Sequence, residues 1–206
     1  MRRLLIVGYG DIGKRFAARY ASQFSLTAVC RTKINDSSSS MRSVNWLNAD
    51  LDTPQTLRRL AGLSDDVVYL APPNPNGPSD KRVRNFLGSI SSGVRIPQRF
   101  VYMSTTGVYG DCAGEFVCET RMAKPQTDRA RRRLDAETQV RAWSKKTGCL
   151  SVVLRVPGIY ASDRLPLKRL MSGLSAVNAS EDSFTNHIHA DDLARIIFFA
   201  LSRGVN

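Results

Sequence analysis

Short apolar runs alternate with longer mixed segments along this chain, and the alternation predicts strands separated by helices. The first run, Leu4–Val7, carries no charge and leads directly into a glycine-rich turn, as a buried parallel strand does. Five further runs of this character predict five further strands: Leu26–Arg31, Val44–Leu47, Asp66–Leu70, Arg99–Ser104 and Ser151–Arg155.

The segments between the runs predict helices. We expect Lys14–Phe24, a helix that starts at Pro54 with Thr53 as its cap, Ser79–Ser92, Thr127–Lys146 and Asp191–Ser202. Strands and helices alternating at this spacing favour an α/β fold, a doubly wound parallel sheet in which residues 1–206 form one domain. Residues 33–42 predict a polar loop, and four prolines stiffen residues 71–78 at the carboxyl edge of the sheet.

Three glycines, Gly8, Gly10 and Gly13, stand between the first strand and the first helix. In this context the pattern indicates a dinucleotide site. Gly8 permits a sharp turn, Gly10 lets the backbone approach a pyrophosphate, and Gly13 lets the helix pack closely on the strand. The helix start adds free N–H groups and the positive end of a dipole. The alternative is a tight turn that binds no ligand.

The residue at the end of the second strand selects the cofactor in such folds. An acidic residue there binds the ribose 2′-hydroxyl, whereas an arginine suits a 2′-phosphate. Arg31 occupies this place, so we expect NADP rather than NAD; alternatively, Arg31 is an exposed loop cation in an arginine-rich chain. We assign these residues to the dinucleotide site: Gly8, Gly10, Asp11, Ile12, Gly13, Arg31, Asp50, Ala71, Pro72 and Ser104.

Composition narrows the function classes. The chain has 206 residues, of which 42% are hydrophobic, and no apolar run approaches the roughly 20 residues of a membrane span. Its start does not fit a signal peptide, so we expect a cytoplasmic protein with no membrane partner. The net charge of +12 suits anionic ligands or a solvated basic surface, and no nucleic-acid-binding motif accompanies it. We therefore do not expect a nucleic-acid partner.

Metal and disulfide chemistry are not indicated. The cysteines form no CxxC pair and no cluster with histidine, which favours reduced, structural thiols: Cys30, Cys112, Cys118 and Cys149. His187 and His189 are the chain's histidines, and they alternate as on a strand. We expect no metal site.

Four segments in sequence order resemble those of one family. Ser104–Gly110 (STTGVYG) resembles the SSxxVYG segment of extended short-chain dehydrogenases/reductases, the NAD-dependent epimerase/dehydratase superfamily. The glycine turn, Leu154–Tyr160 and Asn186–Asp192 fit the same family. The GxGxxG spacing is similar to that of an atypical branch, short bacterial proteins of the YeeZ type. The resemblance implies a NAD(P)-binding Rossmann fold, a small substrate lobe to which residues 156–186 contribute, and a chain truncated at its C-terminus.

The family's chemistry implies roles for particular residues. It uses a hydroxyl from the fifth-strand motif, a tyrosine that exchanges a proton, and a lysine four residues later that lowers the tyrosine pKa. Thr105 falls on the hydroxyl position. With Glu137 as the anchor, the tyrosine position falls on Arg129 and the lysine position on Arg133. No tyrosine lies within residues 111–158, so no small shift of register restores the pair.

This departure leaves the roles of the two arginines open. An arginine cannot exchange protons at neutral pH, but it can bind a carboxylate or phosphate. Arg129 and Arg133 are four residues apart and share one helix face; alternatively, both are solvated cations paired with neighbouring acidic residues. Tyr109 is the candidate replacement for the missing acid.

The resemblance also places residues around the substrate. Arg164, Lys168 and Arg169 lie where relatives build the substrate-facing lobe, and they either recognise a small anionic substrate or coat a helix. Asp191 and Asp192 are expected to cap the last helix, with a catalytic role as the alternative. Relatives often form two-fold dimers through their long helices, which leaves a homodimer open.

Two functions follow. The first is a NADP-dependent oxidoreductase or epimerase acting on a small polar or nucleotide-sugar-like substrate, with Thr105, Tyr109, Arg129 and Arg133 as candidate catalytic residues. The second is a non-catalytic NADP(H)-binding sensor or scaffold, favoured by the missing tyrosine–lysine pair.

Overall fold

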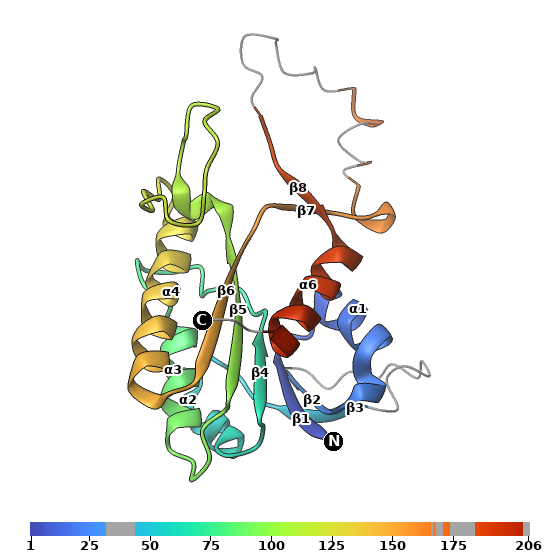
Figure 1. Ribbon diagram of the computed structural model, residues 1–206, viewed down its shortest axis with the longest axis vertical. Coiled ribbons are helices and arrows are strands. Elements are labelled where there is room, and N and C mark those ends of the chain that lie inside the picture. Colours follow the sequence, from blue (N-terminus) through green and yellow to red (C-terminus); the bar gives the residue numbers. More distant parts are fainter. Residues whose placement is uncertain (32–43, 166, 168–170, 174–183, 204–206) are drawn as a thin grey trace.

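Six parallel strands form the main sheet, in the order β3-β2-β1-β4-β5-β6 (Figure 1). The computed structural model of the protein describes residues 1–31, 44–165, 167, 171–173 and 184–203, so the polar loop predicted at residues 33–42 lies outside the described residues. The strands are β1 (Arg2–Val7), β2 (Phe24–Cys30), β3 (Val44–Asn48), β4 (Asp66–Tyr69), β5 (Arg99–Thr105) and β6 (Leu150–Val156). This strand order is that of the doubly wound Rossmann fold, which confirms the predicted fold class.

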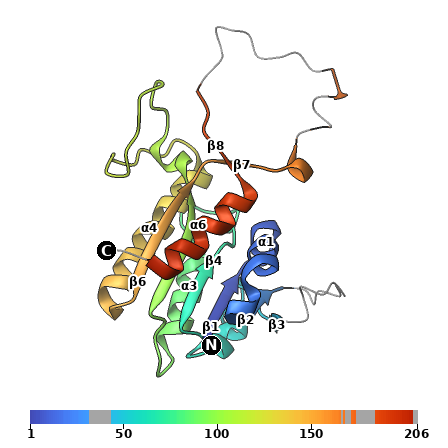
Figure 2. The ribbon, with the colours of Figure 1, turned by 45° about the vertical axis from the view of Figure 1, so that its right-hand side comes forward.

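Helices cover both faces of the sheet. Helices α1 and α6 lie on one face, and α2, α3 and α4 lie on the other (Figures 1 and 2). Their bounds are α1 (Asp11–Tyr20), α2 (Pro54–Leu57), α3 (Lys81–Ser91), α4 (Asp128–Thr147) and α6 (Ala190–Arg203). Single 3₁₀ turns are η1 (Ala21–Gln23), η3 (Arg58–Leu60), η4 (Thr106–Tyr109) and η5 (Ser162–Arg164).

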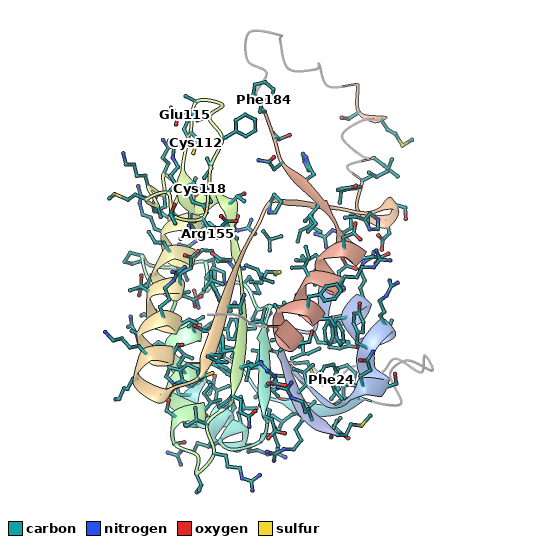
Figure 3. The ribbon with its side chains drawn as sticks, in the orientation of Figure 1. Phe24, Cys112, Glu115, Cys118, Arg155 and Phe184 are labelled. Atoms are coloured by element: carbon teal, nitrogen blue, oxygen red, sulfur yellow. The ribbon has the colours of Figure 1, made fainter. Side chains whose placement is uncertain are left out.

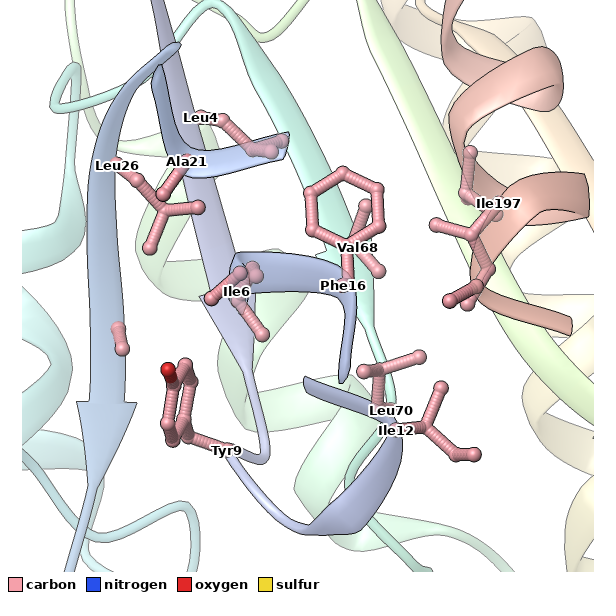
Figure 4. Close-up of a cluster of buried hydrophobic side chains, with 14 of the residues drawn as sticks. Leu4, Ile6, Tyr9, Ile12, Phe16, Ala21, Leu26, Val68, Leu70 and Ile197 are labelled. Atoms are coloured by element: carbon pink, nitrogen blue, oxygen red, sulfur yellow. The ribbon is translucent and has the colours of Figure 1, made fainter. Parts of the chain in front are cut away.

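The central strand β1 supplies the core of both faces. Leu4 and Ile6 pack in the cluster beneath α1 and α6, where Phe16 of α1 also lies (Figure 4). Leu5 and Val7 pack in the cluster on the other face. All four strand residues are fully buried, and burying such a side chain contributes about 1.5–3 kcal/mol. The first apolar run has no polar position because both sides of this strand are covered.

Side-chain caps start α3 and α4. The carboxylate of Asp80 accepts from the backbone N–H groups of Arg82 and Val83, at 3.0 and 3.2 Å, and so starts α3. Thr127 caps α4, because its hydroxyl oxygen accepts from the backbone N–H of Ala130 at 3.2 Å. Thr53 is the N-cap residue of α2 and Pro54 begins that helix, as predicted, but the Thr53 side chain makes no capping hydrogen bond.

The bounds of α1 and β2 differ from the prediction, and a second small sheet is present that the sequence did not predict. Helix α1 begins at Asp11 because Gly10 is its N-cap, and it ends at Tyr20. Phe24, predicted inside that helix, has extended backbone and begins β2, and its ring packs 6.1 Å from that of Phe16. A second, two-stranded parallel sheet, β7 (Gly158–Tyr160) with β8 (His187–His189), extends beyond the carboxyl edge of the main sheet (Figure 1).

No helix in the described part of the chain is both long and apolar enough to cross a bilayer. The four cysteines are free thiols.

Candidate functional site

The glycine turn joins β1 to α1 at the carboxyl edge of the sheet. Gly8 has a φ of 93°, and a Cβ there would lie 2.5 Å from the backbone nitrogen of Ala71. Gly10 is the N-cap of α1, so no side chain caps this helix, and the space where a Cβ would stand is open. The first helical hydrogen bond runs from the N–H of Lys14 to the carbonyl of Gly10, at 2.9 Å. The preceding N–H groups therefore suit an external anion such as a pyrophosphate.

A cavity of about 310 Å³, called here the first cavity, opens beside this turn. The ends of β1 and β2, the segments after β3 and β4, and Arg82 of α3 line it. Six residues of the predicted dinucleotide site are in its wall: Gly8, Gly10, Arg31, Asp50, Ala71 and Pro72. The first cavity therefore lies in the crevice where doubly wound sheets bind their ligands.

The other four predicted dinucleotide residues lie outside this wall. Asp11, Ile12 and Gly13 form the first turn of α1, and the side chain of Ile12 is buried in the core (Figure 4). Ser104 is buried at the end of β5, where its hydroxyl donates to Glu137. Direct contact of these four residues with a dinucleotide stays a prediction.

Arg82 is a charged residue of the first cavity that sequence reasoning missed. Its Nε and Nη2 donate to the two carboxylate oxygens of Asp52, at 2.9 and 2.5 Å, and its Nη1 donates to the carbonyl of Pro72 at 3.1 Å. This pairing holds the pKa of Asp52 below its ordinary value, and Asn74 adds a hydrogen bond in the same direction. No local pattern in the sequence distinguishes Arg82 from the other helix arginines.

A second cavity, of about 360 Å³, lies farther along the same edge. Its wall includes Thr105, Arg129, Ile159 and Arg164. The Thr105 oxygen accepts from the N–H of Gly107 at 3.2 Å, and its own hydrogen makes no hydrogen bond within the described residues. The Arg129 side chain is exposed and makes no hydrogen bond or ion pair with the residues the structure describes. The predicted hydroxyl and the predicted anion-binding arginine thus share one cavity.

Asp11 follows Gly10, which lines the first cavity, and its carboxylate binds Arg164, which lines the second. Its carboxylate accepts from Nε of Arg15 at 2.9 Å and from Nη1 of Arg164 at 2.7 Å. Partial burial would raise the pKa of Asp11, but the hydrogen bonds from Arg164 and Arg15 outweigh it and hold the pKa below its ordinary value. Arg15 also donates to Asp163 and Asp191, so one side chain ties α1 to η5 and α6.

The predicted cap of the last helix is wrong. Helix α6 begins at Ala190, so Asp191 and Asp192 lie within its first turn, where their charge suits the helix dipole. Asp191 pairs with Arg15, and Asp192 pairs with Arg195 at 3.1 Å. Ion pairing with residues of α1 and α6, rather than capping, is therefore the observed role of both carboxylates.

A buried polar cluster joins the ends of β5 and β6 to helix α4. Glu137, on α4, is 1% exposed and accepts from the hydroxyl of Ser104 at 2.5 Å. It also accepts from Nε and Nη2 of Arg155, at 3.2 and 2.8 Å. Arg155 lies on β6 below the loop that carries Cys112, Glu115 and Cys118 (Figure 3). This cluster fixes the end of β5 against α4.

The Tyr109 ring also belongs to this cluster. The Arg155 guanidinium lies 4.6 Å from its centroid, a cation–π distance. Tyr109 is absent from the walls of both cavities. Its role as a proton donor stays a prediction.

Arg133 is buried, with 4% of its surface exposed, so the alternative that it is a solvated cation is wrong. Its Nη1 donates to the carbonyls of Ala71 and Met103, at 3.3 and 2.8 Å, and to the hydroxyl of Tyr102. Burial raises the pKa of Tyr102 to about 12 even though Arg133 lowers it, so this phenol stays protonated at neutral pH. Arg133 thus links helix α4 to the segment after β4 and to the end of β5 by hydrogen bonds.

Among the described residues, no group of three or more His, Cys, Asp or Glu side chains is arranged to hold a metal ion. Lys168 and Arg169, predicted to face the substrate, lie outside the described residues.

Comparison with known proteins agrees with this geometry. The model of the NAD dependent epimerase/dehydratase family matches residues 4–206. The chain belongs to this family, as its four sequence segments predicted. No curated protein matches the chain.

Solved structures share the fold at low identity. UDP-N-acetylglucosamine 4-epimerase from Methanobrevibacter ruminantium M1 is 13% identical, with a TM-score of 0.79 over 98% of this chain and 73% of its own. UDP-glucose 4-epimerase from Thermus thermophilus, in complex with NAD, is 19% identical, with a TM-score of 0.77 over 97% and 74%. A dTDP-glucose 4,6-dehydratase from Streptomyces venezuelae, with NAD bound, is 19% identical, with a TM-score of 0.78 over 97% and 72%.

Proposed function

We propose that this protein is an oxidoreductase or epimerase that binds a nicotinamide dinucleotide in the first cavity and a small anionic substrate in the second. The observation that carries the proposal is the second cavity itself. Its wall contains the Thr105 hydroxyl, with a hydrogen to donate, and the Arg129 guanidinium, which has no partner among the described residues. An unpaired guanidinium beside a hydroxyl suits a substrate with a carboxylate or phosphate and a nearby oxygen.

Different residues of the chain have different proposed roles in binding and catalysis. The glycine turn and the start of α1 hold the pyrophosphate, and the dinucleotide, when bound, supplies hydride chemistry. Thr105 donates a hydrogen bond to the reacting oxygen of the substrate. Arg129 binds the anionic group and fixes its orientation. Arg133 and Glu137 act as positioning residues, because each ties the end of β5 to α4.

We assign the donation of a proton to the substrate to the Tyr109 phenol. Its ring lies against Arg155 and off the cavity wall, so the phenol has to leave that contact to reach the substrate. Arg129 cannot take over this step, because an arginine does not release its proton at neutral pH.

A non-catalytic NADP(H)-binding sensor or scaffold is the second candidate. A buried Arg133 at the lysine position and a Tyr109 held by Arg155 both favour it. Tight dinucleotide binding with no turnover on any substrate would establish it and contradict the enzyme.

Thr105→Val is expected to lower turnover about 100-fold, because the valine is of similar size but lacks the hydroxyl. Arg129→Gln is expected to raise KM about tenfold or more, because it removes the anchor for the anion. The measurement follows nicotinamide absorbance with carbonyl and nucleotide-sugar substrates. Arg131→Gln is the control, since Arg131 pairs with Asp128 on the exposed side of α4, outside both cavities. Equal turnover in Thr105→Val and the unsubstituted protein would contradict the assignment.

The dinucleotide is proposed to be NADP rather than NAD. Arg31 lines the first cavity at the end of β2, and its side chain makes no hydrogen bond within the described residues. Arg31→Asp is expected to weaken NADPH binding more than NADH binding, because the new carboxylate repels a 2′-phosphate and suits a 2′-hydroxyl. Calorimetric titration with each dinucleotide measures the difference. Equal losses for the two would mean that Arg31 does not contact the 2′-phosphate.

A further inference from the structure

The guanidinium of Arg82 has donors that the described part of the chain does not use. A guanidinium carries five N–H groups. Three of them donate to Asp52 and Pro72, which leaves one on Nη1 and one on Nη2 without an acceptor among the described residues. The side chain is 12% exposed and lines the first cavity. Arg82 is therefore a fixed, nearly buried cation at the cavity wall with unused donors.

Arg31 places a second guanidinium in the same wall. Its backbone carbonyl accepts from the side chain of Asn48 at 3.0 Å, which fixes the backbone at the end of β2. Both Arg82 and Arg31 act electrostatically on Asp52 and lower its pKa. Two guanidiniums therefore stand near one carboxylate, on the side of the first cavity where β2 and β3 end.

The formal charges of the four charged residues at the β2 and β3 side of the first cavity sum to zero. Arg31 and Arg82 contribute two positive charges, and Asp50 and Asp52 contribute two negative ones. Net charge therefore gives no strong preference for a phosphorylated ligand, and the arrangement of the groups decides. A phosphate bound next to Arg31 comes close to the Arg82 guanidinium, part of which already donates hydrogen bonds to Asp52. The phosphate also comes close to the Asp52 carboxylate, whose negative charge repels it.

We propose that Arg82 is a second ligand of the 2′-phosphate of the dinucleotide, and that Asp52, by pairing with Arg82, sets how strongly the 2′-phosphorylated dinucleotide is preferred. The proposal rests on the proposed function, because it requires a dinucleotide in the first cavity. Asp52 has two opposed effects: it holds the Arg82 guanidinium in place, and it competes with the phosphate for that guanidinium. The unphosphorylated dinucleotide carries a neutral hydroxyl in this position, so both effects on its binding are smaller.

The test compares dissociation constants for NADPH and NADH in three proteins: the unsubstituted chain, Arg82→Gln and Asp52→Asn. Arg82→Gln is expected to weaken NADPH binding about tenfold, the effect of losing a charge-assisted hydrogen bond, and to leave NADH binding nearly unchanged. Asp52→Asn is expected to tighten NADPH binding severalfold and to leave NADH binding nearly unchanged, because it removes the competing charge.

The Asp128–Arg131 pair supplies matched controls. Arg131→Gln and Asp128→Asn make the same charge changes on an exposed i,i+3 pair of α4, outside both cavities. Neither control is expected to change the ratio of the two dissociation constants. Arg82→Lys keeps the charge without the fork, so it tests the same contact if Arg82→Gln lowers the melting temperature.

The outcomes separate the two proposals. Equal changes for NADPH and NADH in Arg82→Gln, or equal changes for the two in Asp52→Asn, would overturn the role of this pair while leaving dinucleotide binding intact. Failure of the unsubstituted chain to bind either dinucleotide would instead overturn the proposed function.

Discussion

Replacing Gly8 by alanine is expected to destabilise the protein by about 3 kcal/mol or more. At the observed φ of 93°, a Cβ would lie 2.5 Å from the backbone nitrogen of Ala71 and 2.7 Å from its Cα. Both atoms belong to the backbone just after β4, so the end of that strand has to move. For a domain of this size, calorimetry should record a melting temperature lower by roughly 6–12 °C.

Gly10→Ala is the matched control. A Cβ at Gly10 would meet nothing within 4 Å, and the residue has φ −89°, which alanine adopts readily. Its melting temperature is expected to match that of the unsubstituted chain, and its dinucleotide affinity is expected to fall because the methyl group intrudes on the pyrophosphate cradle. An unchanged melting temperature in Gly8→Ala would contradict the close approach of the two strand ends.

Glu137→Gln is expected to cost about 3 kcal/mol of unfolding free energy, because it leaves a largely buried guanidinium without its counter-charge. Glu137 is 1% exposed, and its partner Arg155 is 15% exposed. The neutral amide also presents donors to Arg155 and Ser104, where the carboxylate presents only acceptors. Urea denaturation at neutral pH measures the loss.

Arg141→Gln is the control for this experiment. Arg141 approaches the same carboxylate from one helical turn away, at 3.5 Å, but its side chain is 58% exposed. A loss below about 0.5 kcal/mol is expected for such a surface contact. Equal losses in Glu137→Gln and Arg141→Gln would contradict the buried cluster as the support of the β5 end.

The strands of the main sheet could be predicted because the chemistry that makes them is local. β1 is buried on both faces and is therefore uniformly apolar from Leu4 to Val7, and the glycines after it are readable without any structure. The prediction for Phe24 is wrong because an apolar residue at helical spacing after Phe16 is compatible with either element. Only the packing of its ring on Phe16 from β2 decides between them.

The site could be predicted only where fold position determines it. Arg31, Asp50 and Ala71 follow strands whose ends must meet at one edge, and all three line the first cavity. Arg82 could not be found, because its partner Asp52 is 30 residues away and the chain holds 30 lysines and arginines. Arg15 is a stronger case, because it reaches Asp191 across 176 residues.

Arg133 illustrates the limit of transferring positions from a family. The register places it on α4 one turn beyond Arg129, and that placement agrees with the helix observed. Its burial could not be inferred, because the acceptors that make it tolerable are the carbonyls of Ala71 and Met103, which are set by tertiary structure.

The bond between Asp11 and Arg164 gives the two cavities a common dependence. Arg164 belongs to the wall of the second cavity, while Asp11 immediately follows the glycine that caps α1 at the first. In the proposed complex, a phosphate at that cap would lie next to Asp11, and an anion beside Arg164 would compete with Asp11 for the Arg164 guanidinium. We therefore expect each ligand to change the affinity of the other, and by the same factor in both directions.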